Sequence, residues 1–208
     1  MEDQMFLDCF GCDVDYSLGK NFADFADQFS KDSRYRTELY KLRRKFMSHA
    51  DGLIHADLHT SNIMASRDKM KVIDMEFAFM GPFGYDLGYL VGNLISQYCA
   101  ACFKRFPSEQ SRKQFKAYLL ATIKSLIETY MKTFTLCWEK SVKERYRGQQ
   151  GLLQSILQEV MEDVPGYASM VNWFRSVSEI PYPDFDIIED KDAKRNACLL
   201  YTSPSPRD

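Results

Sequence analysis

The stretch LIHADLHTSNIM, residues 53–64, decides how this sequence is interpreted. Its first two and last two residues are apolar, and two histidines, an aspartate and an asparagine lie between them. The leading apolar pair predicts a short buried strand, so the polar residues would follow directly at the end of that strand. Asp57 comes two residues after His55 and five before Asn62, which gives the spacing H-x-D-x-x-x-x-N.

A second acidic group follows this stretch along the chain. Asp74 lies 17 residues after Asp57, within the sequence VIDME. Residues 63–65 and 70–73 predict two short strands joined by a polar turn. Such a hairpin returns the chain to its starting point, so we expect Asp74 to lie opposite Asn62.

These residue types suit phosphoryl transfer, a reaction that needs an aligned acceptor hydroxyl and a metal to neutralise phosphate charge. Asp57 is the candidate that accepts or orients the hydroxyl proton. Asn62 and Asp74 offer hard oxygen ligands of the kind that Mg²⁺ prefers. Glu76 projects to the same side as Asp74 if the strand continues, and would then join the metal ligands.

The two histidines have separate interpretations. We expect His55 to be structural, with its imidazole bonded to backbone near the loop. For His59 two interpretations stay open, a surface histidine and a substrate contact. The alternative to the whole motif is a polar turn followed by a capping aspartate, because short motifs also match by chance.

The rest of the sequence predicts a small β element followed mainly by helices. Residues 1–30 lack a regular pattern, whereas an apolar stripe between residues 115 and 134 predicts a long helix. This order is expected of the C-terminal lobe of a protein-kinase-like fold, in the α+β class and mainly α. The expected helices are 32–49, one that opens at residues 89–94, 108–147, 152–162 and 168–176, with a loop at 180–185.

Composition narrows the classes of function. The 208 residues are 45% hydrophobic with a formal net charge of −2, which suits one globular domain or two small ones. The basic run at 41–45 is too short for a nucleic-acid footprint, so no nucleic-acid partner is expected. No apolar run has the length of a signal peptide or a membrane span. We therefore expect no membrane association and a reduced, cytoplasmic setting for the six cysteines.

The sequence resembles the methylthioribose kinase family, within the aminoglycoside-phosphotransferase-like superfamily. The likeness lies in LIHADLHTSNIM and in VIDMEFAFMGPFGYDLG, residues 72–88. Members of the superfamily share His-Gly-Asp-Leu-His near the start of the catalytic loop, and the likeness extends over residues 1–197. It implies ATP- and Mg²⁺-dependent phosphorylation of the 1-hydroxyl of 5-methylthioribose, in methionine salvage, by a homodimer.

The resemblance also implies roles for particular residues. By position, Asp57 is the catalytic base, and Asp74 and Glu76 bind the metal that accompanies ATP. Asp86 braces the catalytic loop from the following helix. Arg175 matches the second arginine of a family pair that contacts the substrate.

Three positions depart from the family pattern. Ala56 stands where glycine is usual, and Asn62 stands where this family has serine, although asparagine is usual in the wider superfamily. Phe174 replaces the first arginine of the pair and removes a charge-assisted contact. The last departure affects the identity of the substrate more than the type of reaction.

Both ends of the sequence differ from a complete kinase. Only 56 residues precede Asp57, too few for the lobe that carries a Gly-rich loop and an ATP-anchoring lysine. We therefore expect a fragment, inactive alone, with the N-terminal ATP-binding lobe missing and a catalytic lobe at 1–197. Residues 198–208, CLLYTSPSPRD, match one reading frame of a common sequencing adapter and are expected to be a non-native or disordered tail.

Three alternatives stay open. Cys9-x-x-Cys12 and Cys99-x-x-Cys102 supply four thiolates for a structural zinc site, although the apolar context of the second pair favours buried, unligated cysteines. A pseudokinase-like helical module without catalysis is the second. The third is a kinase for another sugar or an amino alcohol, which a substrate panel would distinguish.

Overall fold

The computed structural model describes residues 5–6, 20–177 and 183–202 of the chain. Helices make up most of this part, and the α+β, mainly α class predicted from the sequence is confirmed. In chain order, the described elements are α2 (Lys20–Lys31), α3 (Ser33–Ser48), β1 (Gly52–Ile54), a 3₁₀ turn (Thr60–Asn62), β2 (Ile63–Ala65), β3 (Met70–Val72), β4 (Phe79–Gly81), α4 (Gly84–Ala101), α5 (Glu109–Ser141), a second 3₁₀ turn (Glu144–Tyr146), α6 (Gln150–Val177), α7 (Pro183–Asp186) and α8 (Lys191–Thr202).

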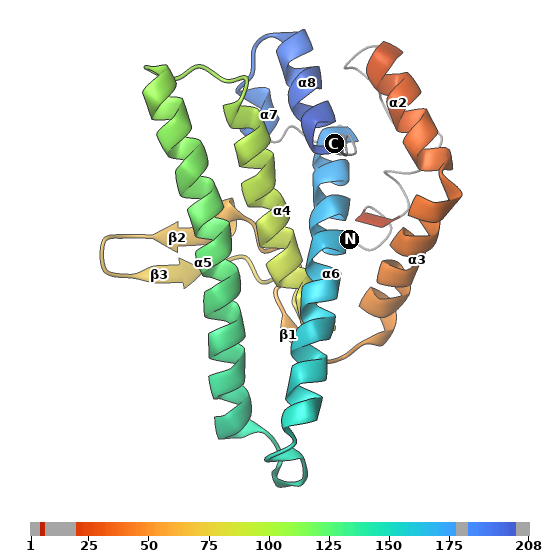
Figure 1. Ribbon diagram of the computed structural model, residues 1–208, viewed down its shortest axis with the longest axis vertical. Coiled ribbons are helices and arrows are strands. Elements are labelled where there is room, and N and C mark those ends of the chain that lie inside the picture. Colours follow the sequence, from red (N-terminus) through yellow and green to blue (C-terminus); the bar gives the residue numbers. More distant parts are fainter. Residues whose placement is uncertain (1–4, 7–19, 178–182, 203–208) are drawn as a thin grey trace.

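Helices α4 and α6 form the centre of the molecule. Figure 1 shows them side by side, with α5 along one flank and α2 and α3 along the other. Glycines let the two backbones come close, because a Cβ added at Gly88 would lie 2.6 Å from the Cβ of Tyr167. A Cβ at Gly92 would similarly lie 2.9 Å from the carbonyl oxygen of Ala168. This packing makes α4 a rigid support for the segments that contact it.

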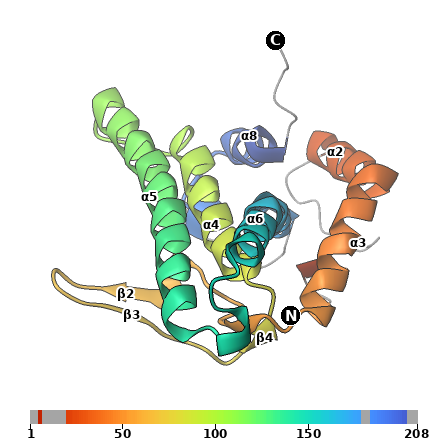
Figure 2. The same cartoon turned by 60° about the horizontal axis from the view of Figure 1, so that its bottom comes forward.

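The four described strands form two antiparallel pairs that hold the polar loop between them. β1 pairs with β4, with Ile54 opposite Phe79, and this pair fixes the point where the loop begins. β2 pairs with β3, with Ile63 opposite Val72, and forms the predicted hairpin. In Figures 1 and 2 this hairpin extends away from the helices, past α5.

The helix predicted at 32–49 is confirmed, since α3 is capped at its start by Asp32 and at its end by His49. The long helix predicted at 108–147 begins as expected, with Ser108 as its N-cap, but α5 ends at Ser141. Four residues of its predicted apolar stripe, Ile123, Leu126, Ile127 and Tyr130, pack against a cluster of α4 and α6 residues.

Two predictions about the later helices were wrong. The helices expected at 152–162 and 168–176 are one continuous helix, α6, which contains Pro165. A proline inside a helix removes one backbone hydrogen bond and crowds the carbonyl four residues earlier, but here α4 packs along both halves of the helix. The loop expected at 180–185 lies partly outside the described residues, and the part that is described belongs to α7.

The two ends also differ from expectation. Residues 20–30, expected to be irregular, belong to α2. The helical pattern expected to break at Cys198 continues in α8 to Thr202, with Cys198 buried at 1% exposure. Residues 203–208 of the expected tail lie outside the described residues.

The cysteines predicted as an alternative zinc site are only partly described. Cys9 and Cys12 lie outside the described residues, while Cys99 is buried in α4 and Cys102 caps the end of this helix. Within the ranges that the structure covers, no group of three or more His, Cys, Asp and Glu side chains is arranged to hold a metal ion. Across the same ranges, none of the helices is both long enough and apolar enough to span a bilayer.

Candidate active site

Two side chains of the loop between β1 and β2 form hydrogen bonds with the backbone of the same loop. His59 precedes the 3₁₀ turn, and its Nδ1 accepts a hydrogen bond from the backbone N–H of Ser61 at 3.2 Å. The turn ends at Asn62, whose side-chain Nδ2 donates to the carbonyl oxygen of Asp57 at 3.0 Å. The loop therefore closes on itself, and Asp57 is held at its centre.

Asp57 is partly buried, and other side chains orient its carboxylate. Nε2 of His59 lies 3.4 Å from Oδ2, and Nδ2 of Asn62 lies 3.4 Å from the same oxygen. Tyr89 of α4 also forms a hydrogen bond with this carboxylate. Burial raises the pKa of Asp57, but the hydrogen bonds from His59 and Tyr89 outweigh it and leave the pKa below its ordinary value. The group is therefore ionised at neutral pH and able to accept a hydrogen bond from a hydroxyl.

His55 connects the loop to the segment that carries Asp74, and its contacts define one tautomer. Its Nε2 lies 2.8 Å from the carbonyl oxygen of Ile73, which only accepts, so Nε2 carries the proton. Its Nδ1 in turn accepts a hydrogen bond from the backbone N–H of Asp57 at 3.3 Å. The buried imidazole thus bonds to backbone on both sides, as the structural interpretation of His55 expects.

Asp86, at the start of α4, holds the beginning of the loop. Its Oδ2 accepts from the backbone N–H of His55 at 2.6 Å, and its Oδ1 accepts from that of Ala56 at 2.9 Å. Burial raises the pKa of Asp86, and these two backbone hydrogen bonds oppose the rise. Two separate oxygens therefore fix two consecutive amides.

Ala56 shows why glycine suits this position. Its φ is +69°, in the left-handed region that favours glycine, and its side chain is fully buried. Asp74 has a φ of +66°, so both non-glycine residues with positive φ in the described ranges belong to this site. Such strain persists where surrounding contacts impose it, and the Asp86 hydrogen bonds supply that constraint at Ala56.

The segment with Asp74 and Glu76 lies beside Asn62, but not as a continued strand. The backbone N–H of Ile73 donates to the carbonyl oxygen of Asn62 at 3.0 Å, directly before Asp74. β3 ends at Val72, so the strand geometry expected to align Glu76 with Asp74 is absent. Glu76 instead lies in a turn, closed by a backbone hydrogen bond from residue 78 to residue 75.

Asn62, Asp74 and Glu76 carry oxygen ligands of the kind that Mg²⁺ prefers. Asp74 and Glu76 are exposed carboxylates, and the Nδ2 of Asn62 is turned to Asp57, which leaves its Oδ1 on the other side of the amide. Mg²⁺ is bound in phosphotransfer sites by one or two carboxylates together with water and substrate phosphates. Two carboxylates and an amide oxygen fit that requirement without a third acidic ligand.

The side chain of Arg175 is buried and held by an ion pair with Asp184. It is 7% exposed, and its Nε donates to Oδ2 of Asp184 at 2.8 Å. Phe174, which stands in place of the other arginine of the family pair, is buried in the main apolar cluster. The contact of Arg175 with a substrate stays a prediction.

Sequence reasoning missed three residues that contact this site or its supports: Tyr89, Asn93 and Asp184. Tyr89 bonds to Asp57, and the Oδ1 of Asn93 accepts from the backbone N–H of Thr60 at 3.0 Å. Both follow Asp86 at helical spacing, three and seven residues later, and this spacing was a usable signal. Asp184 had no local signal, because only the tertiary fold brings it to α4.

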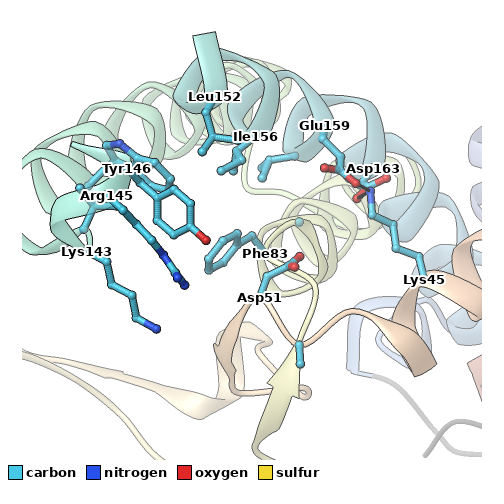
Figure 3. Close-up of a pocket in the computed structure, with 15 residues that line it drawn as sticks. Lys45, Asp51, Phe83, Lys143, Arg145, Tyr146, Leu152, Ile156, Glu159 and Asp163 are labelled. Atoms are coloured by element: carbon cyan, nitrogen blue, oxygen red, sulfur yellow. Dashed lines mark ion pairs between the residues drawn. The ribbon is translucent and has the colours of Figure 1, made fainter. Parts of the chain in front are cut away.

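One cavity of the molecule lies away from these residues. It has a volume of about 640 Å³ and lies between α3, α5 and α6, beyond the opposite end of β1. Figure 3 shows Lys45, Glu159 and Asp163 on one side of it, where Lys45 lies 2.5 Å from each carboxylate, and Arg145 and Tyr146 on the other. None of the predicted site residues lines this cavity.

Comparison with known proteins places the chain among phosphotransferases. A model of the family described as "Phosphotransferase enzyme family" matches residues 14–126. A methylthioribose kinase of Geobacillus thermodenitrificans (strain NG80-2) is 35% identical over 207 residues, which cover 96% of this chain and 49% of that protein.

Two further relatives carry the same name. The methylthioribose kinase of Geobacillus sp. (strain WCH70) is 33% identical over 96% of this chain and 48% of its own length. The methylthioribose kinase of Exiguobacterium sibiricum is 31% identical over 84% of this chain and 43% of its own length. The chain thus spans about half the length of the curated relatives it matches. With more than half of its residues matched by the family model, this chain belongs to the phosphotransferase enzyme family.

Proposed function

We propose that this chain is the catalytic lobe of a small-molecule kinase that transfers the γ-phosphate of ATP to the 1-hydroxyl of 5-methylthioribose, in methionine salvage. The observation that carries the proposal is the carboxylate of Asp57, ionised at neutral pH and oriented by His59, Tyr89 and Asn62. The names of the relatives support the choice of acceptor.

In this proposal Asp57 accepts the hydrogen bond of the acceptor hydroxyl and aligns its oxygen with the phosphate. A carboxylate of lowered pKa is a weak base, so Asp57 orients the hydroxyl first and receives its proton as the new oxygen–phosphorus bond forms. Asn62, Asp74 and Glu76 would hold Mg²⁺, which neutralises charge on the phosphates of ATP.

Two residues are proposed on the substrate side. His59 lies next to Asp57, with 23% of its side chain exposed, and suits a contact with the sugar. Arg175 is the other proposed contact, and it would act from its pair with Asp184. A cytoplasmic location and a homodimer belong to the same proposal, and both rest on the family resemblance.

The test is ATP-dependent phosphorylation of methylthioribose by a polypeptide that joins this chain to the part of a relative that it does not cover. Asp57→Asn should lower the rate by about 10²–10⁴-fold, the usual loss for a positioned acid or base. Asp68→Asn is the matched control, because Asp68 lies in the turn of the hairpin, between β2 and β3, and is exposed. Equal rates for Asp57→Asn and the control would contradict the assigned role.

Two further measurements separate the alternatives. A panel of sugars and amino alcohols tests the acceptor, and a preference for any of these over methylthioribose would retain the kinase and change its substrate. Calorimetry of the 208-residue chain tests whether it acts alone. We expect weak binding of Mg-ATP, and tight binding would contradict the proposal that the chain needs a further lobe.

A further inference from the structure

One face of α4 carries a row of polar side chains that leads away from the catalytic loop. After Asp86, this row consists of Tyr89, Asn93 and Gln97, spaced four residues apart and therefore one above another on the helix. Tyr89 bonds to Asp57, Asn93 bonds to the backbone of Thr60, and Gln97 donates to Oδ1 of Asp184. The row thus connects the loop to a buried acidic residue of α7.

The side-chain amide of Asn93 is bonded at both ends and is 1% exposed. Its Oδ1 accepts from the backbone N–H of Thr60 at 3.0 Å, and its Nδ2 donates to Oδ2 of Asp184 at 3.2 Å. The flipped amide would point its oxygen at a carboxylate and its nitrogen at an N–H donor. Only one orientation therefore satisfies both neighbours, and the charge of Asp184 selects it.

Asp184 is itself a buried ion, 4% exposed, and its charge is compensated from α6. Nε and a terminal nitrogen of Arg175 both donate to Oδ2, while Asn93 and Gln97 donate from α4. Lys104 is a further cation close enough to interact with this carboxylate. The carboxylate is thus surrounded by donors, and the end of the Asn93 amide that faces it is a donor as well.

We propose that Asn93 is a positioning residue for the catalytic loop, and that the Asp184–Arg175 ion pair fixes the orientation of its amide. Thr60 begins the 3₁₀ turn that ends at Asn62, and Asn62 holds Asp57. The ion pair between α6 and α7 therefore acts on Asp57 through Asn93 and that turn. The catalytic meaning of this connection rests on the proposed function, whereas the connection itself does not.

Hydrogen exchange of the Thr60 amide in the 208-residue chain tests the connection without any catalytic assay. Asn93→Leu removes both hydrogen bonds and should speed exchange at this amide by about tenfold or more, because the N–H of Thr60 loses its acceptor. The matched control is Asn172→Leu. Asn172 is also fully buried between α4 and α6, and it donates to the carbonyl oxygens of Gly92 and Ala168 instead. Asn172→Leu should lower global stability. The protection of the Thr60 amide relative to neighbouring loop amides should stay the same as in the unmodified chain.

A second variant keeps the test decisive if Asn93→Leu does not fold. Asn93→Asp places a carboxylate against Asp184, so at about pH 7 the two charges repel and the Thr60 amide should exchange fast. Towards about pH 5 the pair shares a proton, because adjacent carboxylates titrate with one raised pKa. The introduced carboxyl group then donates to Asp184 and accepts from Thr60, and protection should return.

Three results would overturn the proposal. They are unchanged Thr60 exchange in Asn93→Leu, an equal rise in the Asn172→Leu control, and Thr60 exchange in Asn93→Asp that does not depend on pH after correction for the intrinsic rate. Failure of the kinase assay with normal Thr60 behaviour would instead contradict only the proposed function. The two proposals therefore fail separately.

Discussion

Replacing Asp86 by asparagine tests whether two amides of the catalytic loop depend on one carboxylate. The two oxygens of Asp86 serve different donors, His55 N–H at 2.6 Å and Ala56 N–H at 2.9 Å. An asparagine has one oxygen, so Asp86→Asn keeps at most one of these bonds and turns an NH₂ group towards the other N–H.

The expected cost follows from these contacts. Losing one bond and leaving one partly buried N–H without an acceptor costs about 1–3 kcal/mol. Burial raises the pKa of Asp86, so removing its charge at neutral pH returns part of that cost. We therefore expect a net loss of about 1–2 kcal/mol, which lowers Tm by about 2–8 °C in a chain of this size.

A matched control exists on α3. Asp32 also accepts from two backbone amides, Arg34 N–H at 2.8 Å and Tyr35 N–H at 3.1 Å, but both bonds go to Oδ1. Asparagine is as good an N-cap as aspartate, so Asp32→Asn should change stability by less than about 0.5 kcal/mol. Urea unfolding gives both differences, and hydrogen exchange at His55 and Ala56 reports the local change. Equal stability of the two variants would refute this account of Asp86.

Three further predictions concern packing, charge and reactivity. Gly88→Ala should lower the free energy of unfolding in urea by about 1–3 kcal/mol, because its Cβ would lie 2.6 Å from a Cβ of α6. Gly151→Ala has no atom within 4 Å of the new Cβ and should raise the free energy of unfolding by about 0.5–1 kcal/mol. A loss of stability in both variants would contradict this account of the packing. The folded-state pKa of Asp57 is lowered, so the stabilisation it supplies is present above its ordinary pKa of about 3.9 and is lost as pH falls through the folded value. The stability difference between the unmodified chain and Asp57→Asn should therefore shrink below about pH 4, and an increase there would show the opposite shift. Burial raises the pKa of Cys99 to about 12 while Cys137 is exposed, so an alkylating reagent followed by mass spectrometry should label Cys137 first and Cys99 only after unfolding.

The sequence predicted the parts of the site that depend on local spacing. The β2–β3 hairpin was expected and is present. It brings Ile73, the residue before Asp74, into a backbone hydrogen bond with Asn62. The apolar stripe of α5 was also readable, because helical spacing alone puts its residues on one face. The end of β3 was not readable, since Ile73 continues the apolar pattern and still bonds to Asn62, the residue opposite it in the β2–β3 register, although β3 itself ends at Val72.

At Pro165, tertiary packing outweighs the local preference of proline to end a helix. The sequence predicted helices at 152–162 and 168–176, one on each side of this proline, where α6 is continuous. The close packing of α4, with Gly88 and Gly92 against α6, holds the helix together on both sides of the proline. No single-sequence pattern contains that contact, because the partners lie more than 70 residues apart along the chain.

The amino-acid sequence by itself determined which residues are candidates for the proposed chemistry, because the spacing of Asp57, Asn62 and Asp74 along a loop and hairpin is local. The tertiary structure alone decided how that chemistry is held. Tyr89 and Asn93 reach the loop because α4 lies beneath it, and Asp184 reaches Asn93 only after α6 and α7 have packed. Buried polar groups need partners wherever the fold can supply them, so the supports of the site come from distant segments.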